Sequence, residues 1–188
     1  VRLIPAKTPV HRSVPGAREA DRLAMLHLAV AADHSGTLAV DDRELKRDTP
    51  SYTVLTLESL RAEFPTRPLL WLIGADAFVH IKQWYQWPRL FELAHFVVLN
   101  RPGYAVASAL APALADVWQG RLSRNASELR DTLAGRILLH TVAPQAISAT
   151  EIRNTLAAGA SDAALAPLLP GAVLAYIRSH QLYAPRAG

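Results

Sequence analysis

The sequence of 188 residues contains no cysteine, which excludes disulfide bonds and thiolate metal sites. It also lacks any apolar run long enough to span a bilayer, and its opening segment Val1–Pro5 reaches a proline before an apolar stretch can develop. We therefore expect neither a transmembrane segment nor a secretory signal, and we expect a cytoplasmic protein.

Several nucleotide and metal signatures are absent as well. The sequence has no Walker loop and no Gly-x-Gly-x-x-Gly, and its seven histidines are isolated from one another, without zinc-ligand spacing. The formal net charge is +4, with arginine far outnumbering lysine, but no basic run exceeds two residues. We interpret this excess as several small anion-binding contacts and expect no nucleic-acid partner.

What is present is an alternation of short apolar strands and amphipathic helices in a chain with 51% hydrophobic residues. This pattern predicts an α/β fold, a Rossmann-like parallel sheet with helices on both faces, in one domain over residues 1–188. Leu69–Gly74 is apolar on both faces, as buried parallel strands are. Residues 105–135 carry no motif. The expected strands are 2–4, 38–40, 69–74, 95–99 and 137–140, and the expected helices include 18–32, 50–64, a helix from 148 and 170–183.

Residues 147–153 place two hydroxyls and a guanidinium around a helix start. Ser148 and Glu151 match a capping box, and the apolar spacing continues behind them as a helix. A helix start attracts phosphate, to which Ser148, Thr150 and Arg153 add donors. The alternative is an ordinary capped helix with a solvated arginine.

Other segments offer further donors and aromatic rings. Ser51-Tyr52-Thr53 is expected in the first turn of a helix opened by Thr49-Pro50, where free N–H groups hold an anion or are simply capped. Trp84-Tyr85 is either a stacking surface or core. The remaining candidates follow predicted strands, where open α/β sheets bind ligands. They are Lys7, His11, Arg12, Asp76 and Arg101. The alternative for Lys7, His11 and Arg12 is a solvated basic loop. The alternatives for the other two are a helix N-cap for Asp76 and an ordinary turn at Pro102-Gly103 for the segment with Arg101.

These segments follow one another in the same order as the motifs of a known family. Ile147–Arg153 resembles the Ile-Ser-x-Thr-x-x-Arg signature of the adenylyltransferases in the nucleotidyltransferase superfamily. The chain as a whole resembles the bacterial nicotinate mononucleotide adenylyltransferases, whose other motifs are matched by Pro5–Arg12, Glu44–Thr53, Ile73–Asp76, Trp84-Tyr85 and Arg101–Tyr104.

The resemblance implies a nucleotidyltransferase fold and transfer of an adenylyl group from ATP to nicotinate mononucleotide, with Mg²⁺ accompanying the ATP. It implies catalytic and ATP-phosphate roles for Ser148, Thr150 and Arg153. Further ATP or phosphate contacts are implied for Lys7, His11, Arg12, Asp76 and Arg101. Contacts to nicotinate mononucleotide are implied for Ser51, Tyr52, Thr53, Trp84 and Tyr85, and no metal ligand among the side chains is implied.

The family's first strand–loop–helix, with its His-x-Gly-His motif, has no counterpart in this sequence. Residues 1–188 therefore resemble an N-terminally incomplete member, and we expect Arg2–Ile4 to lie next to a vacancy or beside Leu69–Gly74. Two alternatives remain open. One is a non-catalytic fragment or pseudoenzyme that binds mononucleotide, and the other is a sister enzyme such as phosphopantetheine adenylyltransferase.

Overall fold

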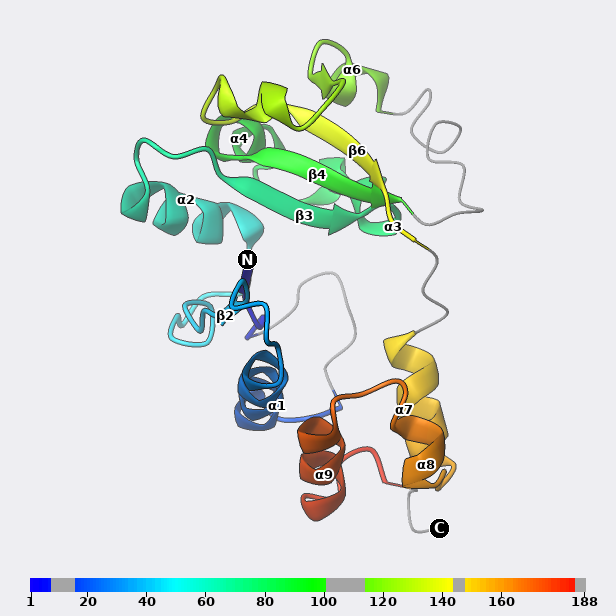
Figure 1. The fold of residues 1–188 in the computed structure, drawn as a ribbon. Coiled ribbons are helices and arrows are strands. Elements are labelled where there is room, and N and C mark those ends of the chain that lie inside the picture. The colour runs from blue at the N-terminus through cyan, green and yellow to red at the C-terminus, as the bar shows by residue number, and fades with distance from the viewer. Residues whose placement is uncertain (8–15, 101–113, 144–147, 185–188) are drawn as a thin grey trace. The chain divides into compact units, whose positions relative to one another are not determined.

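The computed structural model describes residues 1–7, 16–100, 114–143 and 148–184, which belong to two compact units (Figure 1). Unit 1 comprises residues 1–51 and 146–188, and unit 2 comprises residues 52–145. Each contains a parallel sheet with helices, which confirms the predicted α/β fold class. The single-domain organisation stays a prediction.

Unit 1 begins with β1 (Arg2–Leu3), continues through α1 (Glu19–Ala31) and reaches β2 (Ala39–Val40). The two short strands pair in parallel, with Arg2 opposite Ala39. The unit is completed from the other end of the chain by α7 (Ala149–Ala157), α8 (Asp162–Leu165) and α9 (Gly171–Ser179). Its core is therefore built from segments far apart in the sequence.

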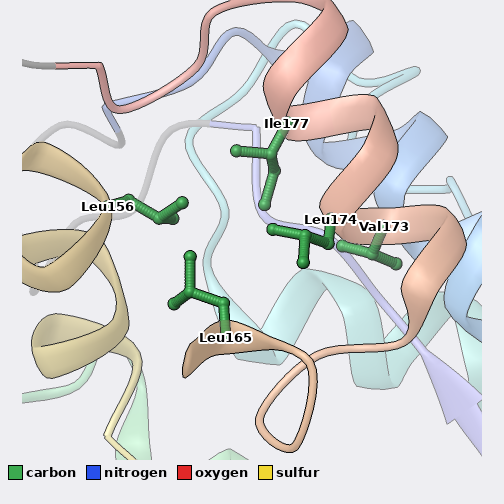
Figure 2. Close-up of a cluster of buried hydrophobic side chains, with 5 residues drawn as sticks. All are labelled: Leu156, Leu165, Val173, Leu174 and Ile177. Atoms are coloured by element: carbon green, nitrogen blue, oxygen red, sulfur yellow. The ribbon is translucent and has the colours of Figure 1, made fainter. Parts of the chain in front are cut away.

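The core of unit 1 is a cluster of aliphatic side chains from α7, α8 and α9 (Figure 2). Its buried members are Leu156, Leu165, Val173, Leu174 and Ile177. Met25 and Leu28 of α1 pack against it. A polar contact joins the same helices, because the hydroxyl of Tyr176 in α9 donates to Oδ1 of the buried Asp21 in α1 at 3.1 Å.

Unit 2 contains four parallel strands in the order β3, β4, β6, β5. Their bounds are β3 Leu70–Gly74, β4 His95–Asn100, β5 Leu122–Ser123 and β6 Ile137–Thr141. The helices between them are α2 (Thr53–Glu63), α3 (Ala75–Phe78), η1 (Ile81–Gln83), α4 (Trp87–Leu93), α6 (Ala115–Trp118) and η2 (Ser127–Arg130). The strand β5 is an addition that no sequence pattern predicted.

One face of this sheet is covered by α3 and α4. The ring of Phe96 in β4 lies 4.8 Å from that of Phe91 in α4 and 6.2 Å from that of Phe78 in α3. On the opposite face, Leu70 and Leu72 are 47% and 50% exposed. The prediction that this strand is buried on both faces is therefore wrong, because the helices pack on the face of Phe96.

Two helix boundaries differ from the sequence prediction. The helix expected to begin at Thr49-Pro50 begins at Thr53, because Ser51 bonds instead to the backbone of Lys7. The last helix ends at Ser179, since the N–H of Leu182 turns back to the carbonyl of Ile177. Within the described residues, no helix has the length and apolar character needed to cross a membrane.

The strand pairing bears on the expectation for Arg2–Ile4. Among the described strands, β1 pairs with β2, and β3 pairs with β4. No described strand pairs with the other edge of β1 or of β3. Within the described residues, both of these edges are therefore without a further strand.

Candidate active site

The structure brings two of the predicted substrate-binding segments of unit 2 together. Tyr52 precedes α2, Tyr85 lies between η1 and α4, and their rings are 4.7 Å apart at an interplanar angle of 36°. Trp84 is the residue directly before Tyr85 and is half-buried. In the preceding η1, Ile81 is fully buried and anchors the segment in the core. The aromatic pair and the start of α2 therefore form one cluster.

The start of α2 is suited to holding an anion. Thr53 is its first residue, and Tyr52 in the N-cap position provides no side-chain hydrogen bond to the helix. No described carbonyl accepts from the N–H groups of Thr53 or Val54, as is usual for a first turn. The first turn also contains no acidic residue that would offset the positive end of the helix dipole. An incoming carboxylate would meet uncompensated positive charge here.

Asp76 lies two residues beyond the end of β3, in α3, and its side chain is exposed. Its carboxylate folds back over Gly74, so that a Cβ added at Gly74 would lie 2.3 Å from Oδ1. Gly74 has φ −68°, a conformation open to any residue. The glycine is therefore required by the position of the carboxylate.

In unit 1, α7 begins as predicted. The hydroxyl oxygen of Ser148 accepts from the N–H of Glu151 at 3.4 Å, which is one half of the capping box. One turn along, Nη2 of Arg153 donates to Oγ1 of Thr150 at 3.2 Å. Both side chains are exposed, so the guanidinium retains further donors. Burial raises the pKa of the Tyr183 hydroxyl, and the positive charges of Arg153 and Arg22 partly offset the rise.

Lys7 and Ser51 are engaged with protein groups. The N–H of Lys7 donates to Oγ of Ser51 at 2.8 Å, while its Nζ donates to the carbonyl of Arg47 at 2.7 Å and to Oδ1 of Asp48 at 3.3 Å. These bonds join the loop after β1 to the segment before α2. In this structure, the hydrogen bonds of Lys7 and Ser51 hold the two segments together.

The predicted site residues thus separate into groups. Tyr52, Thr53, Trp84, Tyr85 and Asp76 belong to unit 2, whereas Lys7, Ser51, Ser148, Thr150 and Arg153 belong to unit 1. The predictions for His11, Arg12 and Arg101 fall outside the described residues.

Sequence reasoning missed Gln86. This residue has a left-handed backbone with φ 51°, and its side-chain amide donates to the hydroxyl of Tyr85 at 3.2 Å. Non-glycine residues in this conformation are uncommon, and they concentrate at functional sites. Nothing in the sequence around Gln86 signals the conformation, since neither glycine nor asparagine stands there.

The donor set fits a Mg²⁺ ion that arrives with a nucleotide. No group of three or more histidine or acidic side chains occurs in the described parts of the chain. Mg²⁺ at phosphate-transfer sites is usually held by one or two carboxylates together with substrate phosphates. Asp76 offers a single exposed carboxylate of this kind.

Comparison with known proteins identifies the family. Residues 1–155 match the cytidylyltransferase-like family. A probable nicotinate-nucleotide adenylyltransferase of Stenotrophomonas maltophilia (strain K279a) is 43% identical over 97% of this chain and 83% of its own length. The corresponding protein of Xylella fastidiosa (strain M12) is 41% identical over 97% of this chain and 82% of its own length. The chain belongs to this family of nicotinate-nucleotide adenylyltransferases. The family resemblance found in the sequence motifs is thereby confirmed.

Solved structures agree on the fold of the family. Plasmodium falciparum nicotinic acid mononucleotide adenylyltransferase complexed with NaAD superposes with a TM-score of 0.65 at 15% identity, covering 97% of this chain and 81% of that chain. The same enzyme complexed with APC gives a TM-score of 0.63 at 14% identity. At such identities the likeness shows the nucleotidyltransferase fold alone.

Proposed function

We propose that this family member transfers the adenylyl group of ATP to nicotinate mononucleotide, giving deamido-NAD and pyrophosphate. The observation that carries the proposal is the contact between the rings of Tyr52 and Tyr85, which joins the start of α2 to Trp84. It gathers an anion-holding helix start and aromatic rings in one place. A pyridine ring with a carboxylate requires both.

The start of α2 accounts for the choice of base. The N–H groups of the first turn, with Thr53, would hold the nicotinate carboxylate, and Trp84 would stack on the pyridine ring. Nicotinamide carries no negative charge, and charge-assisted hydrogen bonds are roughly twice as strong as neutral ones. The site should therefore prefer the acid to the amide.

The chemistry requires no general base. The phosphate of the mononucleotide, whose second pKa is about 6, is largely dianionic at neutral pH. One of its oxygens attacks the α-phosphorus of ATP, a new P–O bond forms, and the bond to the β-phosphate oxygen breaks to release pyrophosphate. The protein then has to align two anions and stabilise charge on the leaving group. Ser148, Thr150 and Arg153 supply donors of the required kind on α7.

When bound with ATP, Mg²⁺ neutralises phosphate charge. The exposed carboxylate of Asp76 would bind a water of the Mg²⁺ ion or a ribose hydroxyl of the nucleotide. We further propose that the protein works in the cytoplasm, which its lack of cysteine fits.

The test measures binding and turnover separately. Calorimetry should show tighter binding of nicotinate mononucleotide than of nicotinamide mononucleotide or 4′-phosphopantetheine, and pyrophosphate release from ATP should follow the same order. Thr53→Val and Trp84→Ala should weaken mononucleotide binding without affecting ATP binding. Equal affinity for the acid and the amide would refute the assigned base choice. Binding without pyrophosphate release would favour the non-catalytic alternative, and preference for phosphopantetheine would favour the sister enzyme.

A further inference from the structure

Resting on the proposed function, we infer that Gln86 is a positioning residue for the mononucleotide site, through its contact with Tyr85. Its amide Nε2 donates to the hydroxyl oxygen of Tyr85 at 3.2 Å, and the ring of Tyr85 in turn lies 4.7 Å from that of Tyr52. A chain of contacts thus leads from Gln86 to the residue directly before Thr53.

The backbone around Gln86 forms a tight turn. The N–H of Trp87 donates to the carbonyl of Trp84 at 3.1 Å, which closes a four-residue turn with Gln86 in its third position. At that position a left-handed residue is usually glycine or asparagine. Gln86 occupies it with φ 51° and ψ 42°, at a cost that left-handed backbone imposes on residues with a Cβ.

The turn also determines where α4 begins. Gln86 is the N-cap of α4, and its carbonyl accepts from the N–H of Arg89 at 2.9 Å. Leu90 and Phe91 in this helix are buried in the core of unit 2. Gln86 therefore links a helix fixed in the core to the aromatic segment that precedes it.

The exposure of Tyr85 makes its contact with Gln86 important for its position. Its side chain is 49% exposed, and the described contacts of its ring and hydroxyl are those with Tyr52 and Gln86. An exposed tyrosine without the amide contact would sample other rotamers. Gln86 thus reduces the ordering cost of binding the pyridine ring beside Trp84.

Three variants separate the side chain of Gln86 from its backbone. Gln86→Gly keeps the left-handed conformation and removes the amide, Gln86→Asn keeps an amide too short to reach Tyr85, and Tyr85→Phe removes the acceptor. The chain offers a matched control in Gln181, which also has φ 51° and lies in unit 1 after α9. Gln181→Gly removes the same side chain from the same backbone conformation.

Calorimetry should show that Gln86→Gly and Gln86→Asn each raise the Kd for nicotinate mononucleotide about threefold to tenfold, the range for one neutral hydrogen bond. The Kd for ATP should change by less than about twofold in both, and Gln181→Gly should change neither constant. On the Tyr85→Phe background, Gln86→Gly should have almost no further effect, because the shared contact is already lost.

Two results would overturn the inference while leaving the proposed function intact. One is a wild-type Kd for nicotinate mononucleotide in Gln86→Gly. The other is a full rise in Kd on the Tyr85→Phe background, which would mean that the amide acts on another group. A wild-type protein that does not bind nicotinate mononucleotide would instead refute the proposed function, and with it the role of Gln86.

Discussion

The hydroxyl of Ser51 accepts a 2.8 Å hydrogen bond from the backbone N–H of Lys7. Forty-four positions separate the two residues in the sequence. The bond is part-buried and joins the loop after β1 to the segment that leads into α2. Both residues belong to segments that resemble the family's substrate-binding motifs. The hydrogen bond between them therefore connects two segments that are predicted to bind ligands.

We expect Ser51→Ala to lower the free energy of unfolding by about 1 kcal/mol, because the N–H of Lys7 loses its acceptor. If binding of nicotinate mononucleotide requires this connection between the two loops, the affinity for it should fall in the same variant. Urea titration and calorimetry measure the two effects. Ser179→Ala is the control, since the described partners of the Ser179 hydroxyl are local, the carbonyl of Tyr176 and Nδ1 of His180. A Ser51→Ala protein as stable as wild type would show that the bond contributes nothing.

Gly74→Ala tests the position of the Asp76 carboxylate. The new Cβ would lie 2.3 Å from Oδ1, so the carboxylate must turn away while the backbone remains relaxed. If Asp76 binds the nucleotide as proposed, the Kd for ATP should rise about tenfold or more, as for loss of a charged hydrogen bond. Gly171→Ala is the control, because nothing lies within 4 Å of its new Cβ. An unchanged ATP affinity in Gly74→Ala would remove Asp76 from the nucleotide site.

Arg61 should be among the residues most important for the stability of unit 2. Its guanidinium donates to four backbone carbonyls, those of Phe64, Arg67, Leu93 and Leu133, at 2.7–3.0 Å. Burial lowers the pKa of Arg61, which nevertheless remains charged. Arg61→Ala should cost about 2–4 kcal/mol, because four carbonyl acceptors, two of them in part-buried hydrogen bonds, lose their partner together.

Chemical denaturation of Arg61→Ala, Arg61→Lys and Arg67→Ala provides the comparison. Lysine cannot reach four carbonyls from one ammonium group, so Arg61→Lys should recover only part of the loss. Arg67→Ala removes an exposed side chain but keeps the carbonyl that Arg61 binds, and it should change stability by less than about 0.5 kcal/mol. Equal losses in the alanine variants of Arg61 and Arg67 would contradict this assignment.

His95 should make stability depend on pH. Its ring is fully buried, with Nε2 2.8 Å from the carbonyl of Thr132 and Nδ1 accepting from the N–H of Arg136 at 3.0 Å. These partners select the neutral ring. Burial lowers the pKa of His95, and the charges of Arg136 and Arg61 lower it further, against the hydrogen bond to Thr132, which raises it.

The direction of the pH dependence of stability follows from the lowered pKa of His95. As the pH falls below about 6.5, the unfolded chain takes up a proton that the folded protein excludes, so folded stability decreases. The slope should reach at most about 1.4 kcal/mol per pH unit. Denaturation curves between pH 5 and pH 8 should show this slope in wild type and lose it in His95→Gln. His27→Gln, at an exposed position on α1, should retain it. A wild-type slope in His95→Gln would assign the effect to another group.

Local patterns predicted most strands and helices of the fold. The alternation of apolar strands with helices located β3, β4 and β6, and Ser148 with Glu151 marked the start of α7. The start of α2 was misplaced because Ser51 bonds to a residue 44 positions away, which no local pattern contains. Leu70 and Leu72 were expected to be buried because an apolar strand does not specify how many of its faces are covered.

Motifs in the sequence identified part of the candidate site. Tyr52, Thr53, Trp84 and Tyr85 were named from motifs in separate segments, and the structure places Tyr52 and Tyr85 in contact. Gln86 was not predictable, because its left-handed backbone comes from the turn between η1 and a core-anchored α4. Such a conformation results from tertiary packing.

Unit 1 is made from both ends of the chain, whereas unit 2 is continuous from residue 52 to residue 145. During synthesis, residues 1–51 leave the ribosome before unit 2 but lack Leu156, Leu165 and the side chains of α9 that form their core. Unit 2 has its complete sequence before residues 146–188 have been made. The part of unit 1 that precedes unit 2 in the sequence therefore completes its core only after unit 2 has been synthesised.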